Sequence, residues 1–208
     1  MKTTQLLQKY PIISDQVDQR ELSVLLQELE RLLVQGQKGA VVEFGCYIGT
    51  TSLFIRRLLD AYGSSDEFHV YDSFEGLPEK TAQDQSVAGD QFVAGELRAP
   101  RRTFIEHFKK AGLALPAIHK GWFSDVSPSD VPDDILFAFL DGDYYQSIAD
   151  SLRLVTPKLH PGAVVVIDDY ASEALPGAAK AADEWARQHG YAIRSVASLG
   201  VVQIPAVL

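Results

Sequence analysis

Short apolar runs alternate along the chain with segments in which apolar residues recur every three or four positions. A continuous apolar run at residues 135–140 is typical of a strand that is buried on both faces of a parallel sheet, and residues 40–44 predict a first buried strand. Near the N-terminus, leucines recur instead with helical spacing, and we expect a helix there that begins after Ser14 or Asp15 and ends at Gly36. Strands that alternate with helices predict a doubly wound α/β sheet.

The same patterns predict the order of the remaining elements. Further strands are expected at 68–71, 117–119, 163–167, 191–197 and 201–204, and further helices at 50–62, 101–112, 145–159 and 177–189. The last two strands flank a Leu-Gly pair and predict an antiparallel hairpin at a sheet edge. We therefore expect a Rossmann-like, mostly parallel sheet with a C-terminal antiparallel hairpin, in one domain that spans 1–208 with an N-terminal helical segment at 1–36.

Residues 74–100 interrupt this alternation. Their composition shifts to glycine, alanine, glutamine and acidic residues, with little periodicity. A connection of this length without regular structure is uncommon in a compact domain and often covers a binding site. We expect a lid loop in this segment.

Composition narrows the class of protein. The 208 residues carry a net charge of −9, and the longest basic runs are pairs, which argues against a nucleic acid as the partner. No apolar run approaches the roughly 18–20 residues that cross a bilayer, and the N-terminus does not resemble a signal peptide. The single cysteine, Cys46, excludes an internal disulfide. These features favour a soluble, cytoplasmic protein without a membrane partner.

Two glycines and three hydroxyl residues follow the first predicted strand. Glycines at 45 and 49 would let the backbone approach a ligand, and the next helix would present its N-terminal amides. The third glycine of the dinucleotide fingerprint is missing, so a ligand with an amino acid and a ribose fits better than a pyrophosphate cofactor. A plain strand-to-helix turn is the alternative. The cofactor-binding candidates of this stretch are Glu43, Gly45, Tyr47, Gly49, Thr50, Thr51 and Ser52.

Asp72 ends the second predicted strand. An acidic residue at this place commonly accepts hydrogen bonds from ribose hydroxyls, although a capping or solvated turn residue is the alternative. Aromatic residues after the third strand could flank an adenine, and Trp122 fits simple core packing equally well. The cofactor-side candidates that follow these two strands are Ser73, Phe74, Gly121, Trp122 and Phe123.

Four aspartates follow the two most apolar strands: Asp141 and Asp143 after one, Asp168 and Asp169 after the other. If the strands are neighbours, Asp141, Asp168 and Asp169 converge, and their mutual repulsion raises their pKa values unless a cation is present. Carboxylate ligands favour a hard divalent cation, Mg²⁺ above all, over zinc. Asp143 fits a cap of the next helix. A purely structural role for all four is the alternative.

Taken together, these residues resemble the macrocin O-methyltransferase (TylF) family, whose members methylate hydroxyls on antibiotic sugars. The matching stretches are VVEFGCYIGTTS (41–52), YDSFEGLP (71–78), KGWFSDVSP (120–128), FLDGDYYQSIADSL (139–152) and PGAVVVIDDY (161–170). The resemblance implies a class I methyltransferase fold, S-adenosylmethionine at the glycine loop, and Mg²⁺ or a similar divalent cation at Asp141, Asp168 and Asp169. It further implies methyl transfer to an oxygen of a small-molecule acceptor, and a homo-oligomer.

Methyl transfer to a hydroxyl requires a group that accepts the hydroxyl proton. Asp141 is the first candidate for this catalytic base, because it could contact both the metal and the hydroxyl, and it is also a candidate on the cofactor side. Asp143 and His119 are weaker candidates, and His119 fits a purely structural place in a strand.

Other functions stay open. A catechol- or phenol-type acceptor is one, since the metal arrangement also resembles that of catechol O-methyltransferases and Tyr144, Tyr145 and Tyr170 would suit stacking on an aromatic ring. An enzyme that uses a nicotinamide or another nucleotide on the same sheet is a second. A binding module without catalysis is a third.

Overall fold

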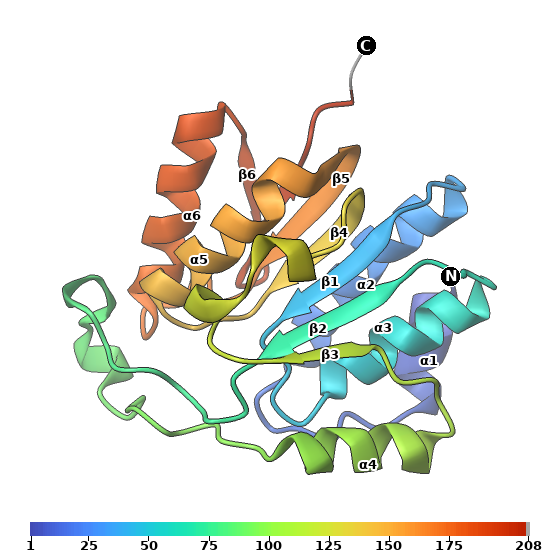
Figure 1. The fold of residues 1–208 in the computed structure, drawn as a ribbon, viewed down its shortest axis with the longest axis horizontal. Helices are drawn as coiled ribbons and strands as arrows, with labels where there is room; N and C mark the ends of the chain where they lie inside the picture. Colours follow the sequence, from blue (N-terminus) through green and yellow to red (C-terminus); the bar gives the residue numbers. More distant parts are fainter. Residues whose placement is uncertain (207–208) are drawn as a thin grey trace.

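The computed structural model describes residues 1–206 and shows a central sheet between two layers of helices (Figure 1). The seven strands follow the order β3-β2-β1-β4-β5-β7-β6. Neighbouring strands from β3 to β5 are parallel, whereas β7 is antiparallel to both β5 and β6. Their bounds are β1 (Ala40–Phe44), β2 (Phe68–Asp72), β3 (Ala117–Lys120), β4 (Ile135–Leu140), β5 (Leu159–Ile167), β6 (Ile193–Val196) and β7 (Leu199–Gln203). The predicted Rossmann-like sheet with a C-terminal antiparallel hairpin is confirmed.

Helices cover both faces of the sheet. On one face lie α2, α3 and α4, with α1 packed against α2 and α3, and on the other face lie α5 and α6 (Figure 1). Their bounds are α1 (Lys2–Lys9), α2 (Gln19–Val34), α3 (Thr50–Ala61), α4 (Arg101–Ala111), α5 (Tyr145–Val155) and α6 (Pro176–His189). Short 3-10 turns are η1 (Ala82–Asp84), η2 (Val87–Gly89), η3 (Phe123–Asp125), η4 (Pro128–Asp130) and η5 (Thr156–Lys158).

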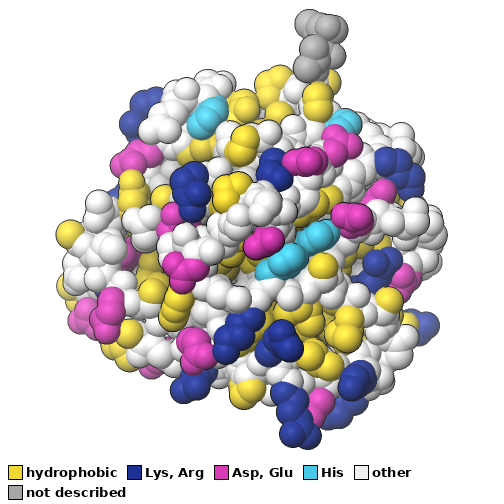
Figure 2. Space-filling model, in the orientation of Figure 1, with side chains coloured by type: hydrophobic (Ala, Val, Ile, Leu, Met, Phe, Trp, Pro, Cys, Tyr) yellow, Lys and Arg dark blue, Asp and Glu magenta, His cyan; other side chains and the backbone are white. Residues whose placement is uncertain are grey.

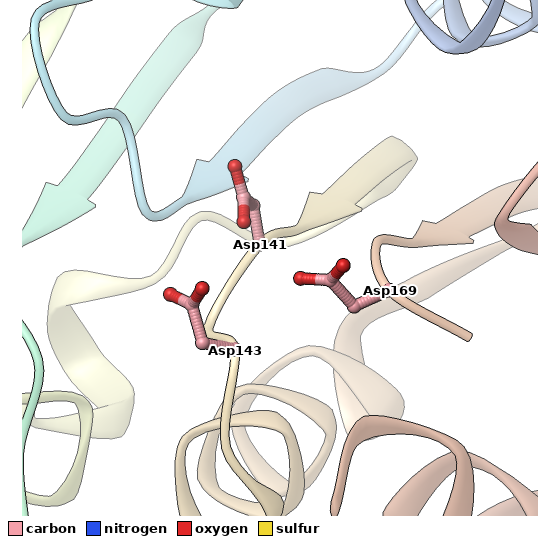
Figure 3. Close-up of side chains that lie close together, drawn as sticks. All are labelled: Asp141, Asp143 and Asp169. Atoms are coloured by element: carbon pink, nitrogen blue, oxygen red, sulfur yellow. The ribbon is translucent and has the colours of Figure 1, made fainter. Parts of the chain in front are cut away.

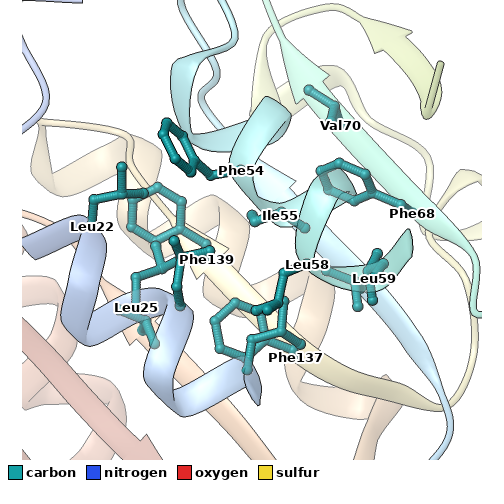
Figure 4. Close-up of a cluster of buried hydrophobic side chains, with 14 of the residues drawn as sticks. Leu22, Leu25, Phe54, Ile55, Leu58, Leu59, Phe68, Val70, Phe137 and Phe139 are labelled. Atoms are coloured by element: carbon teal, nitrogen blue, oxygen red, sulfur yellow. The ribbon is translucent and has the colours of Figure 1, made fainter. Parts of the chain in front are cut away.

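The continuous apolar run of the central strand β4 is explained by burial of both of its faces. Phe137 and Phe139 point into the core beneath α2 and α3, where Leu22 and Phe54 pack nearby (Figure 4). Ala138 and Leu140 face the core beneath α5 and α6. Because side chains alternate between the faces of a strand, a sheet covered on both sides favours apolar residues at successive positions.

The N-terminal helical segment differs from its prediction. It forms two helices, and α2 begins after Asp18 rather than after Ser14 or Asp15. One carboxylate oxygen of Asp18 accepts hydrogen bonds from the amides of Arg20 (2.7 Å) and Glu21 (3.2 Å), so this side chain satisfies two amides of the first helical turn.

Two further boundaries were wrong for local reasons. Helix α5 ends at Val155 rather than at residue 159, because Pro157 cannot continue a helical hydrogen-bond ladder. The hairpin turns at Ala197, whose φ is 58°, and not at the Leu-Gly pair, which lies inside β7. Leu199 is almost fully buried, and that burial places it in the strand.

Surface charges are mixed. In the face that Figure 2 shows, acidic side chains are scattered over the surface, and basic side chains gather mainly toward the lower edge, where α4 lies in Figure 1. Among the described residues, no helix is both long enough and apolar enough to cross a membrane.

Candidate functional site

A cavity lies at the carboxyl ends of β1, β2, β4 and β5. Its walls come from the glycine loop after β1, from the loops after β2, β4 and β5, and from residues 14–21 before and within the start of α2. Open α/β sheets bind ligands at this edge, near the point where the strand order reverses, and here that point lies between β1 and β4.

Both glycines of the loop make room for protein atoms. Gly45 has φ +89°, and a Cβ there would overlap the carbonyl oxygen of Asp141. The two strand ends are joined at this point, since the amide of Asp141 donates to the carbonyl of Phe44 (2.8 Å). Gly49 has φ +90° and precedes α3, and a Cβ there would lie 2.7 Å from the ring of Phe104 on α4. The glycines therefore permit close packing of the loop against β4 and α4, and their close approach to a ligand stays a prediction.

Asp72 holds the loops that border the cavity. One carboxylate oxygen accepts hydrogen bonds from the amides of Cys46 (2.8 Å) and Tyr47 (3.1 Å), and the other accepts from the amide of Phe74 (2.6 Å). The side chain also lines the cavity. Its position fixes the glycine loop and the start of the segment 74–100 relative to each other, and its contact with a ribose stays a prediction.

Glu43 is a fully buried acid in the middle of β1. The hydroxyl of Ser52 donates to its Oε2 (2.5 Å), while Oε1 has no hydrogen-bond partner among the described residues. Burial in the protein, opposed by the Ser52 hydrogen bond and assisted by the nearby charge of Asp72, raises the pKa of Glu43 to about 8. The group is therefore largely protonated at neutral pH.

The cofactor-side candidates divide into two groups. Those that line the cavity are Glu43, Gly45, Tyr47, Thr50, Thr51, Asp72, Ser73, Trp122, Phe123 and Asp141. Those that lie behind its wall are Gly49, Ser52, Phe74 and Gly121. The second group supports the wall: Ser52 holds Glu43, and Phe74 packs edge-on against Phe104.

The aspartates that follow β4 and β5 come together. Leu140 pairs with Ile167 across these neighbouring strands, so the residues that follow them leave the sheet side by side. Carboxylate oxygens of Asp141, Asp143 and Asp169 lie within 4.8 Å of one another (Figure 3).

The membership of this acidic cluster differs from the expected set. Asp143 does not cap α5: Tyr144 occupies the N-cap position, and Asp143, with φ 60°, joins the cluster. Asp168 also lines the cavity, but its Oδ1 accepts a hydrogen bond from the amide of Asp169 (3.0 Å). The convergence of Asp141 and Asp169 agrees with the expectation, and the role of Asp168 as a ligand stays a prediction.

Electrostatics favour a cation at the cluster. Protein surrounds these carboxyls on most sides, and this burial together with the neighbouring acids raises the pKa values of Asp141 and Asp168 well above the usual range. Burial, followed by repulsion from Asp168, raises the pKa of Asp143 to about 7, and burial with repulsion from Asp143 does the same for Asp169. A group of acids in this condition holds either protons or a cation, and a set of carboxylate oxygens alone fits a hard divalent ion.

His119 lies outside the cavity wall. Its ring stacks on Tyr71 at a centroid distance of 4.4 Å, and its Nε2 lies 3.1 Å from Nδ1 of His69. Burial and the neighbouring His69 lower its pKa. The structural place in a strand accounts for these contacts, so the candidates for the base narrow to the carboxylates.

The three tyrosines expected on the acceptor side are also outside the wall. The hydroxyl of Tyr144 donates to the carbonyl of Phe92 (3.2 Å), that of Tyr145 to Glu184 (2.7 Å), and that of Tyr170 to Asp183 (2.8 Å). These hydrogen bonds link Tyr144 to the 74–100 segment and the other two tyrosines to α6, and none of the three residues lines the cavity.

Several residues of the wall were not anticipated. From the N-terminal segment come Ser14, Gln16, Val17 and Glu21, and from the lid come Leu77, Phe92 and Leu97. Glu21 accepts a hydrogen bond from the hydroxyl of Ser198 and contributes to the high pKa of Asp169. No local sequence pattern marks these residues, because they reach the cavity only through the packing of α2 and of the lid.

Known proteins with similar sequences are O-methyltransferases. The sequence profile of the Macrocin-O-methyltransferase (TylF) family matches residues 10–201. A 4'-O-methyltransferase of Streptomyces olivaceus, named for its substrate 8-demethyl-8-(2,3-dimethoxy-alpha-L-rhamnosyl)-tetracenomycin-C, is 36% identical over 70% of this chain and 58% of its own length. The mycinamicin III 3''-O-methyltransferase of Micromonospora griseorubida is 30% identical over 87% of this chain and 74% of its own length. The chain thus spans less than two thirds of the first of these relatives.

Solved structures support the fold. The O-methyltransferase NovP superposes with a TM-score of 0.79 at 23% identity, covering 91% of this chain and 81% of NovP. The calicheamicin methyltransferase CalS11 superposes with a TM-score of 0.73 at 18% identity, covering 97% of this chain and 90% of CalS11. At these identities the likeness concerns the architecture alone.

Proposed function

The chain belongs to the macrocin O-methyltransferase (TylF) family, and on this premise we propose that it transfers the methyl group of S-adenosylmethionine to a hydroxyl oxygen of a sugar or another natural product. A single observation supports the proposal most: one continuous cavity is lined both by the glycine loop with Asp72 and by the acidic cluster. A methyl donor and a hydroxyl acceptor can therefore occupy adjacent parts of one space.

The methyl donor belongs, in this proposal, on the β1 and β2 side of the cavity. There the glycine loop, which Asp72 holds in place, and the start of α3 form the wall. The partly exposed side chain of Trp122 and the ring of Phe123 border the same part and offer flat apolar surfaces for a nucleobase.

A divalent cation, Mg²⁺ or a similar ion, would be held by Asp141 and Asp169, with Asp143 or Asp168 as a further carboxylate. Their oxygens are close together, are the type of donor such an ion prefers, and repel one another without one. A cation bound there supplies charge stabilisation for an acceptor oxygen that loses its proton.

The reaction forms one bond and breaks one. The acceptor oxygen attacks the methyl carbon, the bond between that carbon and the sulfonium sulfur breaks, and S-adenosylhomocysteine leaves. We assign the hydroxyl proton to a carboxylate of the cluster, first to Asp141, which borders both parts of the cavity, and otherwise to Asp143. With the cation bound, such a carboxylate is ionised and can accept this proton if it lies within hydrogen-bond reach of the hydroxyl.

The acceptor class follows from the relatives and from the N-terminal segment. Both relatives named above are O-methyltransferases by name, and the name of the first gives a rhamnosyl-tetracenomycin as its substrate. In this chain Ser14, Gln16 and Glu21 add polar groups to the cavity, and such groups suit the several hydroxyls of a sugar. Because the expected tyrosines do not reach the cavity, a phenol acceptor has less support.

Two measurements test the proposal. Calorimetric titration with S-adenosylhomocysteine should show binding, whereas titration with NAD(H) should not. Transfer of radioactive methyl groups to a panel of deoxysugar and phenol acceptors should occur with Mg²⁺ for at least one sugar, and should stop with excess EDTA or in Asp141→Asn. Absence of S-adenosylhomocysteine binding would refute the activity, and full transfer in EDTA would refute only the metal. Light scattering tests the predicted homo-oligomer.

A further inference from the structure

The lid, residues 74–100, docks on the N-terminal ends of α5 and α6. Its turn η1 contacts α6, and the segment lies beside both helices, in green in Figure 1. A small apolar cluster of Leu77, Tyr144 and Leu175, with Phe92 at its edge, fills the space beneath it. One acidic residue of the lid, Asp84, is fully buried in this contact and has no part in the proposed chemistry.

Asp84 forms hydrogen bonds in two directions. Its Oδ2 accepts from the amide (2.8 Å) and the hydroxyl (2.6 Å) of Thr81, which closes the η1 turn within the lid. Its Oδ1 accepts from the amide of Tyr145 (2.7 Å), the first residue of α5. The carboxylate also packs closely against Gly177 at the start of α6. A side chain 61 residues away in the sequence therefore caps α5.

The capped amide of Tyr145 lies close in the chain to the acidic cluster. Asp143 lies two residues before Tyr145, and Tyr144 between them has no side chain that caps the helix. The hydroxyl of Tyr144 makes a second connection to the lid through the carbonyl of Phe92 (3.2 Å). Asp143 itself has a φ of 60°, a backbone conformation that needs support from its surroundings.

We infer that Asp84 is a positioning residue that couples docking of the lid to the placement of Asp143 in the acidic cluster. The inference rests on the proposed metal-dependent methyl transfer. When Asp84 accepts the hydrogen bond from Tyr145, the turn that carries Asp143 is held beside Asp141 and Asp169. When the lid leaves, this cap is lost and the turn relaxes, which lowers affinity for the cation.

Other contacts of the lid provide a contrast. The hydroxyl of Ser86 donates to the carbonyl of Glu173 (2.6 Å), and the amino group of Lys180 donates to the carbonyl of Gln83 (2.6 Å). Both hold the lid near the start of α6 and neither touches the turn that carries Asp143. Their loss should loosen the lid and leave the acidic cluster intact.

The test compares four variants with the wild-type chain. Asp84→Asn leaves one acceptor oxygen where two are needed, so it cannot satisfy Thr81 and Tyr145 together. Tyr144→Phe removes the second connection and serves as an independent variant if the first folds poorly. Ser86→Ala removes a contact to the α6 side, and Asp90→Asn makes the same charge change at an exposed lid position.

Mn²⁺ binding is measured by the loss of the free-ion signal in electron paramagnetic resonance, and lid docking by hydrogen exchange of peptides that cover 74–100 and 144–152. We expect Asp84→Asn to raise the Mn²⁺ dissociation constant at least about fivefold and Tyr144→Phe about twofold, with faster exchange in both peptides. Ser86→Ala should speed exchange only in the lid peptide, and Asp90→Asn should match wild type. Affinity for S-adenosylhomocysteine should stay within about twofold throughout.

The outcomes separate the inference from the proposed function. If wild-type protein fails to bind Mn²⁺, the metal proposal is wrong and the inference falls with it. If wild type binds Mn²⁺ and Asp84→Asn loosens the lid without changing that affinity, the proposed function stands and the coupling is refuted. A loss in Ser86→Ala as large as in Asp84→Asn would also refute it, because the effect would then belong to the lid as a whole.

Discussion

Replacement of Glu43 by glutamine tests whether this buried acid of the cavity wall is protonated at neutral pH. Glu43 is fully buried in β1, and its only hydrogen bond among the described residues comes from Ser52. Glutamine has nearly the same shape and keeps an oxygen that can accept this hydrogen bond, but it cannot ionise. The variant therefore removes the titration with little change in packing.

The magnitude follows from the pKa. Each pKa unit corresponds to about 1.4 kcal/mol, so a rise from 4.5 to about 8 on folding amounts to about 5 kcal/mol. Between these pH values the folded state binds the proton of Glu43 and the unfolded state does not. The free energy of unfolding therefore falls as pH rises: the contribution is complete below pH 4.5 and is lost by about pH 8.

The assay is urea-induced unfolding, followed by circular dichroism in EDTA at pH values from about 5 to 8. We expect Glu43→Gln to gain about 3 kcal/mol relative to wild type between about pH 5 and 7.5, because folding of the wild type must bind a proton that becomes scarcer as pH rises, whereas glutamine does not titrate. Glu173→Gln, at an exposed position, is the control and should follow wild type at every pH. A constant difference between Glu43→Gln and wild type would refute the raised pKa.

Three further predictions concern the loops of the cavity. Asp168→Ala and Asp143→Ala should identify the further metal ligand, because removal of a ligand should weaken Mn²⁺ binding at least about tenfold and keep S-adenosylhomocysteine affinity within about threefold. Wild-type Mn²⁺ affinity in both variants would exclude both residues as ligands. Asp72→Asn leaves fewer acceptors for three backbone amides, so calorimetry should show S-adenosylhomocysteine binding weakened about tenfold, and unchanged binding would mean that the loop holds its shape without this acid. Gly45→Ala should lower the free energy of unfolding by more than about 2 kcal/mol in thermal melts, whereas Gly63→Ala, which shares a positive φ but faces open space, should cost less; equal losses would contradict the overlap.

The sequence specifies the central strands of this fold better than its turns. The bounds of β1 and β4 match the stretches expected at 40–44 and 135–140, because strands buried on both faces are apolar at almost every position, with Glu43 as the exception. The start of α2 was misplaced because the chain offers Ser14, Asp15 and Asp18 as caps of similar quality. Which one is used depends on where the preceding segment packs.

In the candidate site, too, the residues that follow central strands could be predicted from the sequence, whereas the conformation of the turns could not. Strand order places the residues after β4 and β5 together, so Asp141 and Asp169 could be anticipated from the pattern alone. The inclusion of Asp143 depends on a backbone angle of 60°, which non-glycine residues seldom adopt and which no periodicity predicts. The cap that Asp84 gives to α5 joins residues far apart in the chain, and a local capping pattern cannot predict it.

In the proposed reaction, donor and acceptor would meet where the strand order reverses between β1 and β4. At that point the amide of Asp141 binds the carbonyl of Phe44, and the hydrogen at Gly45 leaves room for the Asp141 carbonyl. The glycine loop and the acidic cluster are thus joined through one backbone contact, without an intervening strand. Because methyl transfer requires the two reacting atoms to approach within about 3–3.5 Å, a displacement at this contact should impair transfer even when both ligands still bind. Gly45→Ala therefore separates positioning from binding: we expect a larger fall in kcat than in S-adenosylhomocysteine affinity, and a fall in affinity alone would place the function of Gly45 in the loop and not in the junction.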